Sequence, residues 1–261
     1  MKPAISAAVL MLGIAGVATA APPATAVGNI EAERYQSCLA TAGREPALAV
    51  TEATKWLGAG GGVPARHCLA LAYLAQQQYI PAALALEAAA HAAEAANDPH
   101  VGELWGQAGN AALAGSDANR ALGYFTTALG TGVLGIDRAE VLIDRARAEV
   151  ELKRDAGART DLDEAVRLDP DSPYAWLLRA TLARRDGDLK SAEASILEAG
   201  KRAPDDADVA LEAGNIAVAQ GNLSLARQAW SAAAAAAPGS PAAIAAGQAL
   251  AANPEGSAPK P

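Results

Sequence analysis

Residues 139–240 read AEVLIDRARAEVELKRDAGARTDLDEAVRLDPDS (139–172), PYAWLLRATLARRDGDLKSAEASILEAGKRAPDD (173–206) and ADVALEAGNIAVAQGNLSLARQAWSAAAAAAPGS (207–240), three segments of 34 residues that align without a gap. We number the positions of each segment from 1 to 34 and call them columns. Small residues and prolines recur in the same columns: Ala158, Ala192 and Ala226 in column 20; Ala165, Ala199 and Ala233 in column 27; and Pro170, Pro204 and Pro238 in column 32. A repeat of this length is typical of stacked helical hairpins. The stretch therefore predicts three copies of one helix-turn-helix unit.

This pattern resembles the tetratricopeptide repeat family. In that family a Trp, a Leu-Gly pair and a Tyr in the first helix are followed by Ala, an aromatic residue and Ala in the second helix, and then by Pro. The segment 207–240 supplies Gly214, Gly221, Ala226, Trp230, Ala233 and Pro238, and the segment 173–206 supplies Trp176, Gly187, Ala192, Ile196, Ala199 and Pro204. The resemblance implies an all-α fold, a right-handed α-solenoid, and a function in binding other proteins.

The same columns continue upstream of residue 139, but the match to them becomes weaker toward the N-terminus. A unit near residues 102–135 matches well, with Trp105, Gly109, Ala121, Phe125 and Ala128. The first unit is degenerate and offers Ala47, Thr51 and Thr54 in its second-helix columns. We predict one solenoid domain over residues 28–253, with about six repeats and about thirteen helices. The predicted units are 28–62, 63–99, 102–135, 139–172, 173–206 and 207–240, followed by a C-terminal capping helix at 241–252.

Column 8 predicts where neighbouring helices approach most closely. Its residues are small in every clear unit: Ala70, Gly109, Ala146, Ala180 and Gly214. Larger side chains there would push the helices beyond the ~8–10 Å separation of packed pairs. One position departs from the pattern, because column 11, usually aromatic, holds Glu149 in the fourth unit. Either that unit is rotated slightly, or Glu149 pairs with a neighbouring arginine.

The composition favours helices and argues against nucleic acid as a partner. Hydrophobic residues make up 51% of the chain but aromatic residues only 4%, so that most of the apolar content is alanine. Alanine is the best helix former but buries little area, and stability must therefore come from many close helix contacts. The 29 acidic residues outnumber the 21 basic ones. This balance disfavours binding to a polyanion.

Both ends of the chain differ in composition from the repeats. Residues 1–20 contain Lys2, an apolar run and Ala18-Thr19-Ala20, a pattern that predicts a signal peptide cut before Ala21. An uncleaved membrane anchor is the alternative. We expect a flexible segment at 21–27, a disordered tail at 254–261, and a periplasmic or secreted protein with no stable membrane insertion after cleavage.

Chemically reactive side chains are few and scattered. Cys38 and Cys68 are the two cysteines, and in an exported protein they predict one disulfide, with free buried thiols as the alternative. The histidines His67, His91 and His100 do not form a metal-binding motif. We therefore expect no metal, no cofactor and no catalytic site.

A binding surface is expected along the first helices. Columns 2, 5, 9 and 12 form one stripe, which in the family lines the concave groove. The candidate peptide-binding residues in this stripe are Leu71, Asn110, Arg147, Thr181, Arg184 and Asn215. In this hypothesis the asparagines bond a peptide backbone and the arginines meet a carboxylate. The alternative is that these residues pack against one another or face solvent.

From these observations we predict a non-catalytic scaffold or adaptor of the bacterial cell envelope that binds peptide segments in its concave groove. Two other functions stay open: a periplasmic module that binds a small ligand in the apolar groove, and an accessory arm of an envelope enzyme complex. The partner is expected to be a protein or peptide, and its identity does not follow from the sequence.

Overall fold

The computed structural model of the chain describes residues 24–254, which form thirteen α-helices and no strand. The predicted signal peptide and residues 255–261 of the predicted tail lie outside the described residues. The helices are α1 (Ala24–Arg44), α2 (Pro46–Gly58), α3 (Gly62–Ala75), α4 (Tyr79–Ala96), α5 (Val101–Ala114), α6 (Ala118–Gly130), α7 (Gly135–Glu151), α8 (Asp155–Leu168), α9 (Pro173–Arg185), α10 (Leu189–Arg202), α11 (Ala207–Ala219), α12 (Leu223–Ala236) and α13 (Pro241–Ala252).

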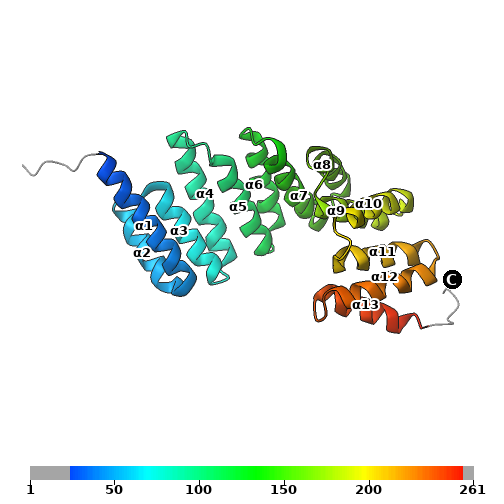
Figure 1. Ribbon diagram of the computed structural model, residues 1–261. Coiled ribbons are helices and arrows are strands. Elements are labelled where there is room, and N and C mark those ends of the chain that lie inside the picture. Colours follow the sequence, from blue (N-terminus) through cyan, green and yellow to red (C-terminus); the bar gives the residue numbers. More distant parts are fainter. Residues whose placement is uncertain (1–23, 255–261) are drawn as a thin grey trace, which may run out of the picture.

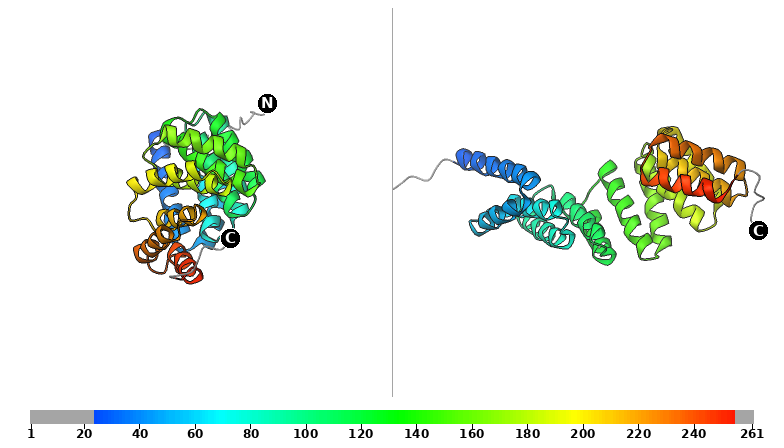
Figure 2. Two further views of the ribbon diagram at one scale, coloured as in Figure 1. Left: turned by 90° about the vertical axis from the view of Figure 1, so that its right-hand side faces the viewer. Right: turned by 90° about the horizontal axis from the view of Figure 1, so that it is seen from below.

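Consecutive helices pair into six hairpins, and the hairpins stack in chain order as an α-solenoid (Figure 1). Odd-numbered helices from α1 to α11 are the first helices of the repeats, and even-numbered helices are the second. The helix direction turns along the stack, so that α11–α13 run across the direction of α1–α6. Seen from below, the molecule is elongated, with α1 and α13 at opposite ends (Figure 2). α13 spans the residues predicted for the capping helix and packs on α12 and α11.

The first helices lie closer together than the second helices. Contacts join α1 to α3, α5 to α7, α9 to α11 and α11 to α13, whereas within residues 24–254 no pair of second helices shares as extensive a contact. The second helices α4 and α6 meet through the phenol of Tyr124, which donates a hydrogen bond to Glu87 at 2.8 Å. A stack that is tighter on one side curves toward that side. The first helices therefore form the inner, concave wall of the solenoid.

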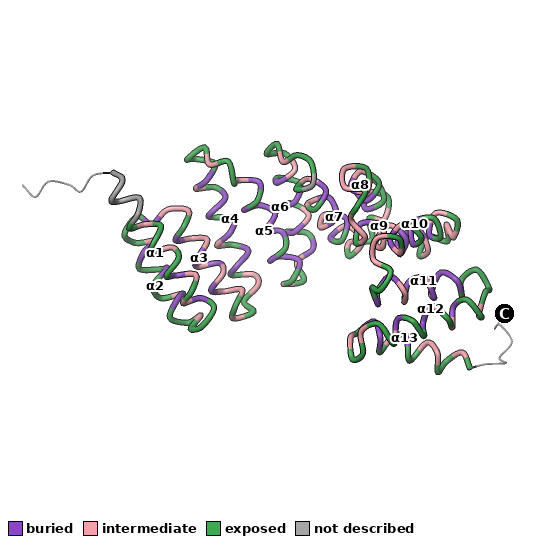
Figure 3. The backbone as a smooth tube through the Cα atoms, in the orientation of Figure 1, coloured by how far each residue is buried: buried purple, intermediate pink, exposed green. Residues whose placement is uncertain are grey.

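In the second to sixth repeats, the two helices of each hairpin are matched in size at columns 8 and 24. Where column 24 is aromatic, column 8 is glycine: a Cβ added to Gly109 would lie 2.4 Å from the ring of Phe125, and one added to Gly214 would lie 2.4 Å from the ring of Trp230. Where column 24 is aliphatic, column 8 is alanine. These pairs are Ala70 with Leu86, Ala146 with Leu162, and Ala180 with Ile196, all buried. Buried segments accordingly recur on the facing sides of the helices (Figure 3).

In the second to sixth repeats, the turn between the two helices places column 15 in the left-handed backbone region. In the two C-terminal repeats this residue is glycine, Gly187 with φ of 81° and Gly221 with φ of 79°. The other repeats use residues that have a Cβ: Gln77, Ser116 and Lys153 have φ between 57° and 60°. This conformation costs more energy for such residues than for glycine. The turn geometry is therefore kept even where the sequence does not favour it.

The first repeat differs from its predicted register. Ala47, Thr51 and Thr54 are exposed, and the buried residues of α2 are Ala49, Ala53 and Trp56, two positions further along. α2 begins at Pro46. Its buried residues lie at the same distances from the start of the helix as the buried residues of the other second helices, and the late start of α2 therefore shifts them by two positions. α1 also begins earlier than expected, at Ala24, within the segment predicted to be flexible.

Cys38 and Cys68 form a disulfide between α1 and α3, with their Cα atoms 6.2 Å apart. Both cysteines are buried beside Ala53, Trp56 and Ala65 in the core between the first and second repeats. The indole of Trp56 donates a hydrogen bond to Glu31 at 2.8 Å. The degenerate first repeat is therefore held by a covalent link in addition to its apolar contacts.

Candidate functional site

Polar side chains join successive first helices along the inner wall. His67 on α3 hydrogen-bonds Gln107 on α5 at 2.8 Å, and Asn110 on α5 donates to Asp144 on α7 at 2.8 Å. Gln107 and Asp144 both occupy column 6 of their repeats. In this region the column 6 residue of each repeat therefore forms a hydrogen bond with a polar side chain of the preceding repeat.

The same arrangement recurs near the C-terminus. Arg184 on α9 donates two hydrogen bonds to Glu212 on α11, at 2.6 Å and 3.3 Å, and Glu212 is also in column 6. The side chain of Glu212 is 7% exposed, and its carboxylate also accepts a hydrogen bond from Asn215 at 3.2 Å. The amide oxygen of Asn215 in turn accepts a hydrogen bond from Trp230 at 3.2 Å. A charge-assisted pair with two bonds fixes the register of α9 against α11.

A cavity of about 640 Å³ lies between α5, the α6–α7 connection and α7. Its floor includes Gly106, and its rim includes Leu134, which is 78% exposed. Four carboxylates line it, those of Glu103, Asp137, Glu140 and Asp144, and no lysine or arginine does. This part of the inner wall is therefore concave and acidic.

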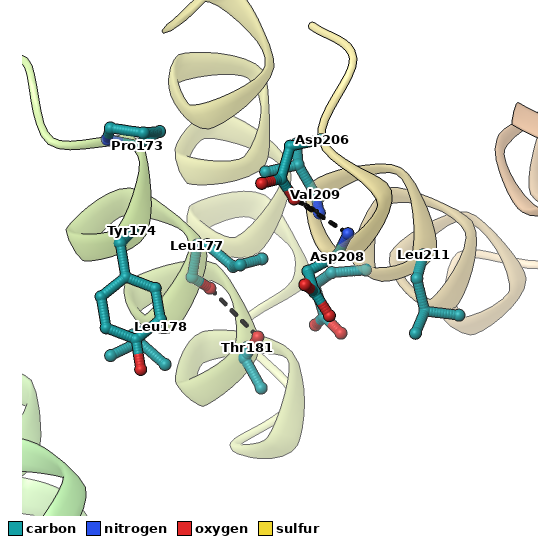
Figure 4. Close-up of a pocket in the computed structure, with 10 residues that line it drawn as sticks. Pro173, Tyr174, Leu177, Leu178, Thr181, Asp206, Asp208, Val209 and Leu211 are labelled. Atoms are coloured by element: carbon teal, nitrogen blue, oxygen red, sulfur yellow. Dashed lines mark hydrogen bonds between the residues drawn. The ribbon is translucent and has the colours of Figure 1, made fainter. Parts of the chain in front are cut away.

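A second cavity, of about 390 Å³, lies between α9 and α11 (Figure 4). Most of its lining is apolar: Pro173, Tyr174, Leu177, Leu178, Val209 and Leu211. The carboxylates of Asp206 and Asp208 and the hydroxyl of Thr181 are its polar groups, together with Glu212. Asp206 caps α11 by accepting from the backbone amides of Asp208 and Val209, both at 2.9 Å. This cavity can take apolar side chains, and a polar backbone can lie at its edge.

The predicted site residues are distributed unevenly over this wall. Asn110 lines the cavity at α5–α7 and Thr181 lines the cavity at α9–α11. Leu71, Arg147, Arg184 and Asn215 line neither of the two. The hydroxyl of Thr181 donates to the carbonyl of Leu177 at 3.0 Å.

The arginines of the predicted stripe already have carboxylate partners within the chain. Arg147 donates to Asp144 at 2.9 Å, one turn earlier on α7, and Arg184 is paired with Glu212 as described above. A carboxylate from a partner would have to displace these contacts. That the two arginines meet a partner's carboxylate stays a prediction.

Sequence reasoning did not single out the residues that give the two cavities their character. Glu103, Glu140, Tyr174 and Asp208 all occupy column 2, and Asp144 and Leu178 occupy column 6. On a helix these columns lie on the same face as columns 5 and 9. Column 2 belongs to the predicted stripe and column 6 lies beside it, so the signal was present in the alignment: these columns hold Glu103, Glu140 and Asp144 in the third and fourth repeats but Tyr174 and Leu178 in the fifth.

The negative charge of this region also acts on a half-buried phenol near the N-terminal end of the wall, that of Tyr35. Tyr35 on α1 contacts the ring nitrogen of His67 at 2.6 Å. Burial raises the pKa of Tyr35, and the negative charge of Glu103 raises it further. Tyr35 therefore stays a neutral phenol at physiological pH and serves as a hydrogen-bonding link between α1 and α3.

Comparisons with known proteins find a known repeat in the C-terminal half of this chain. Profiles of the tetratricopeptide repeat match residues 139–182 and 177–241. PilF of Pseudomonas aeruginosa superposes with a TM-score of 0.66 at 16% identity, over 86% of this chain and 98% of PilF. PilW, described as a widely conserved type IV pilus biogenesis factor, gives 0.66 at 17% identity over 82% of this chain and 97% of PilW. YrrB, described as a tetratricopeptide repeat protein with an unusual peptide-binding site, gives 0.53 at 18% identity over 70% of this chain and 91% of YrrB.

At these identities the structural neighbours establish the fold alone. No curated protein sequence matches the chain significantly. Among the helices of residues 24–254, none combines the length and the apolar character needed to span a membrane.

Proposed function

Because this chain is a tetratricopeptide repeat protein, we propose that it is a non-catalytic scaffold of the cell envelope that binds peptide segments of partner proteins along its inner wall. The observation that carries the proposal is the apolar cavity between α9 and α11, which lies on the concave side of the stack and is lined by partly exposed apolar side chains. Tyr174, for example, is 46% exposed. Concave apolar surfaces with a few polar groups at their edge are typical peptide-binding sites.

Two further features support this proposal. The Cys38–Cys68 disulfide is compatible with an oxidising compartment outside the cytoplasm, which agrees with the signal peptide expected at residues 1–20. The peptide-binding site described for YrrB occurs on the same kind of fold.

The binding site is tested by blocking the α9–α11 cavity while keeping the side-chain hydrogen bonds that join successive first helices. We choose Tyr174→Ala combined with Thr181→Arg, which removes an exposed ring and fills the space beside it. Leu84→Ala is the matched control, because Leu84 is 45% exposed and lies on α4, a second helix. Circular dichroism and thermal unfolding establish that all variants fold.

Crosslinking in envelope extract followed by quantitative mass spectrometry then compares the variants. We expect proteins captured by the wild type and by Leu84→Ala to be reduced several-fold with the cavity variant. Equal capture by all three proteins would refute binding at this cavity. Stabilisation of the wild type by metabolites, with no change in protein capture, would favour a small ligand instead, because the cavity volume also falls in the range of small-molecule sites.

A further inference from the structure

The acidic cavity at α5–α7 is distinct in chemistry from the apolar cavity at α9–α11. Asp137, Glu140 and Asp144 follow one another on α7 at spacings of three and four residues, which puts them on one face of the helix. Glu103 on α5 lines the same cavity from the opposite side. Four negative charges therefore surround one concave space.

These charges are only partly compensated within the described part of the chain. Asp144 receives hydrogen bonds from Asn110 and Arg147, and Glu103 accepts from Gln107 at 3.0 Å. Within residues 24–254 the side chains of Asp137 and Glu140 form no hydrogen bond or ion pair. Asp137 lies in the first turn of α7, where the helix dipole favours a carboxylate, but Glu140 and Asp144 lie beyond that turn. Like charges at these spacings oppose one another, and a bound cation would relieve this repulsion.

The shape of the cavity favours a polypeptide over a metal ion. Among residues 24–254 no three potential ligands converge closely enough to hold a metal. The carboxylates are instead spread around a space of about 640 Å³ that also exposes the side chain of Leu134. An exposed leucine beside separated carboxylates suits a lysine or arginine side chain, which has an apolar stem and a charged end.

We propose that the α5–α7 cavity binds a lysine- or arginine-containing segment of a partner protein. This inference rests on the proposed function, because it takes the inner wall to be the binding face. The two cavities then have different roles: the α9–α11 cavity receives apolar side chains, and the α5–α7 cavity selects partners by positive charge. Binding at the acidic cavity weakens as salt is added.

The test is a selection from a random peptide display library on the folded wild-type chain, followed by binding of individual selected peptides to two variants. Glu103→Gln combined with Glu140→Gln removes two charges from the cavity. Glu33→Gln combined with Glu52→Gln is the control, because it changes the net charge equally at exposed residues of α1 and α2 that form no ion pair. Thermal unfolding confirms that both variants fold.

We expect the selected peptides to be enriched in lysine and arginine. They should bind the cavity variant about 3- to 10-fold more weakly than the wild type and bind the control variant nearly as well as the wild type. Selected peptides without basic residues, or equal weakening in both variants, would overturn the inference and leave the proposed function standing. Failure to select any peptide would count against both.

Discussion

At the scale of single residues, the pairing of column 8 with column 24 explains the glycines of the inner helices. Phe125 and Trp230 are buried, with 0% and 2% exposure, so neither ring can move outward to make room. A glycine opposite the ring is then required by space and not by backbone conformation. Repeats with Leu or Ile in column 24 have room for alanine instead.

This size match predicts the effect of adding one methyl group. Gly109→Ala should lower the free energy of unfolding by about 1–3 kcal/mol, since its Cβ would overlap the Phe125 ring. Gly123→Ala is the matched control: nothing lies within 4 Å of its Cβ, and alanine should stabilise α6 by about 0.5–1 kcal/mol. Adding Phe125→Leu to Gly109→Ala recreates the pair found in the second and fourth repeats and should recover part of the loss. Chemical denaturation measures the free energy of unfolding of the wild type, the two single variants and the double variant. Strictly additive effects of the two substitutions would contradict the size match between columns 8 and 24.

Glu149 is the residue that departs most clearly from its column. Its carboxylate lies against Gly157 of α8, where an added Cβ would be 2.4 Å from Oε1, and the buried Oε2 accepts no hydrogen bond. The expected arginine partner is therefore not a hydrogen-bonded one. Arg145 instead binds Asp161 through two hydrogen bonds, at 2.6 Å and 2.7 Å. Burial raises the pKa of Glu149, the negative charge of Asp161 raises it further, and Arg145 and Arg154 act in the opposite direction.

The raised pKa of Glu149 predicts that this residue lowers the stability of the folded state in a pH-dependent way. The folded state holds the Glu149 proton more tightly than the unfolded state, so its contribution to stability falls as pH rises from the unfolded value near 4.5 through the raised value. Glu149→Gln should stabilise the protein at neutral pH by less than about 1 kcal/mol, because the group keeps some solvent. Below about pH 4 the difference should vanish. Urea unfolding of the wild type and of Glu149→Gln across this pH range measures the difference between their free energies of unfolding. A difference that grows as the pH falls would refute this explanation.

At the scale of helices and repeats, the disulfide compensates for the weak first unit. The bond closes a loop of 30 residues in sequence separation, and α1 has only one repeat neighbour. Replacing Cys38 and Cys68 by serine should destabilise the first repeat by about 3–4 kcal/mol in the chain-entropy description. Since repeats couple mainly to their neighbours, amide exchange should accelerate in α1–α3 and stay unchanged in α9–α13. Uniform acceleration over the whole chain would show that the repeats unfold as one unit.

The sequence predicted the helical hairpins well wherever the small-residue columns were intact. The repeats from α5 to α12 follow from the alignment because close backbone approach admits few residue types, and the disulfide follows from the presence of only two cysteines. The register of α2 did not follow, because its large residue, Trp56, lies two positions beyond the predicted column 27 and packs against Gly61 outside the usual pairing. The side-chain hydrogen-bond networks could not be predicted from the repeat pattern either. The presence of an arginine in the stripe does not indicate whether it forms an ion pair with a carboxylate on the next repeat.

At the scale of the whole molecule, the two cavities lie on the side toward which the stack curves. The inner wall changes along the chain from acidic at α5–α7 to apolar at α9–α11. The second helices face outward and do not contribute to the concave binding face. A partner that lies along the array can therefore be recognised by charge in one repeat and by apolar side chains in another.

The central claim, that the inner wall is the binding face, is tested most directly by hydrogen–deuterium exchange of the intact protein with and without a selected peptide. The account predicts slower exchange in the first helices α5, α7, α9 and α11, with little change in α4, α6, α10 and α12. Protection confined to the second helices, or no protection at a saturating peptide concentration, would contradict it.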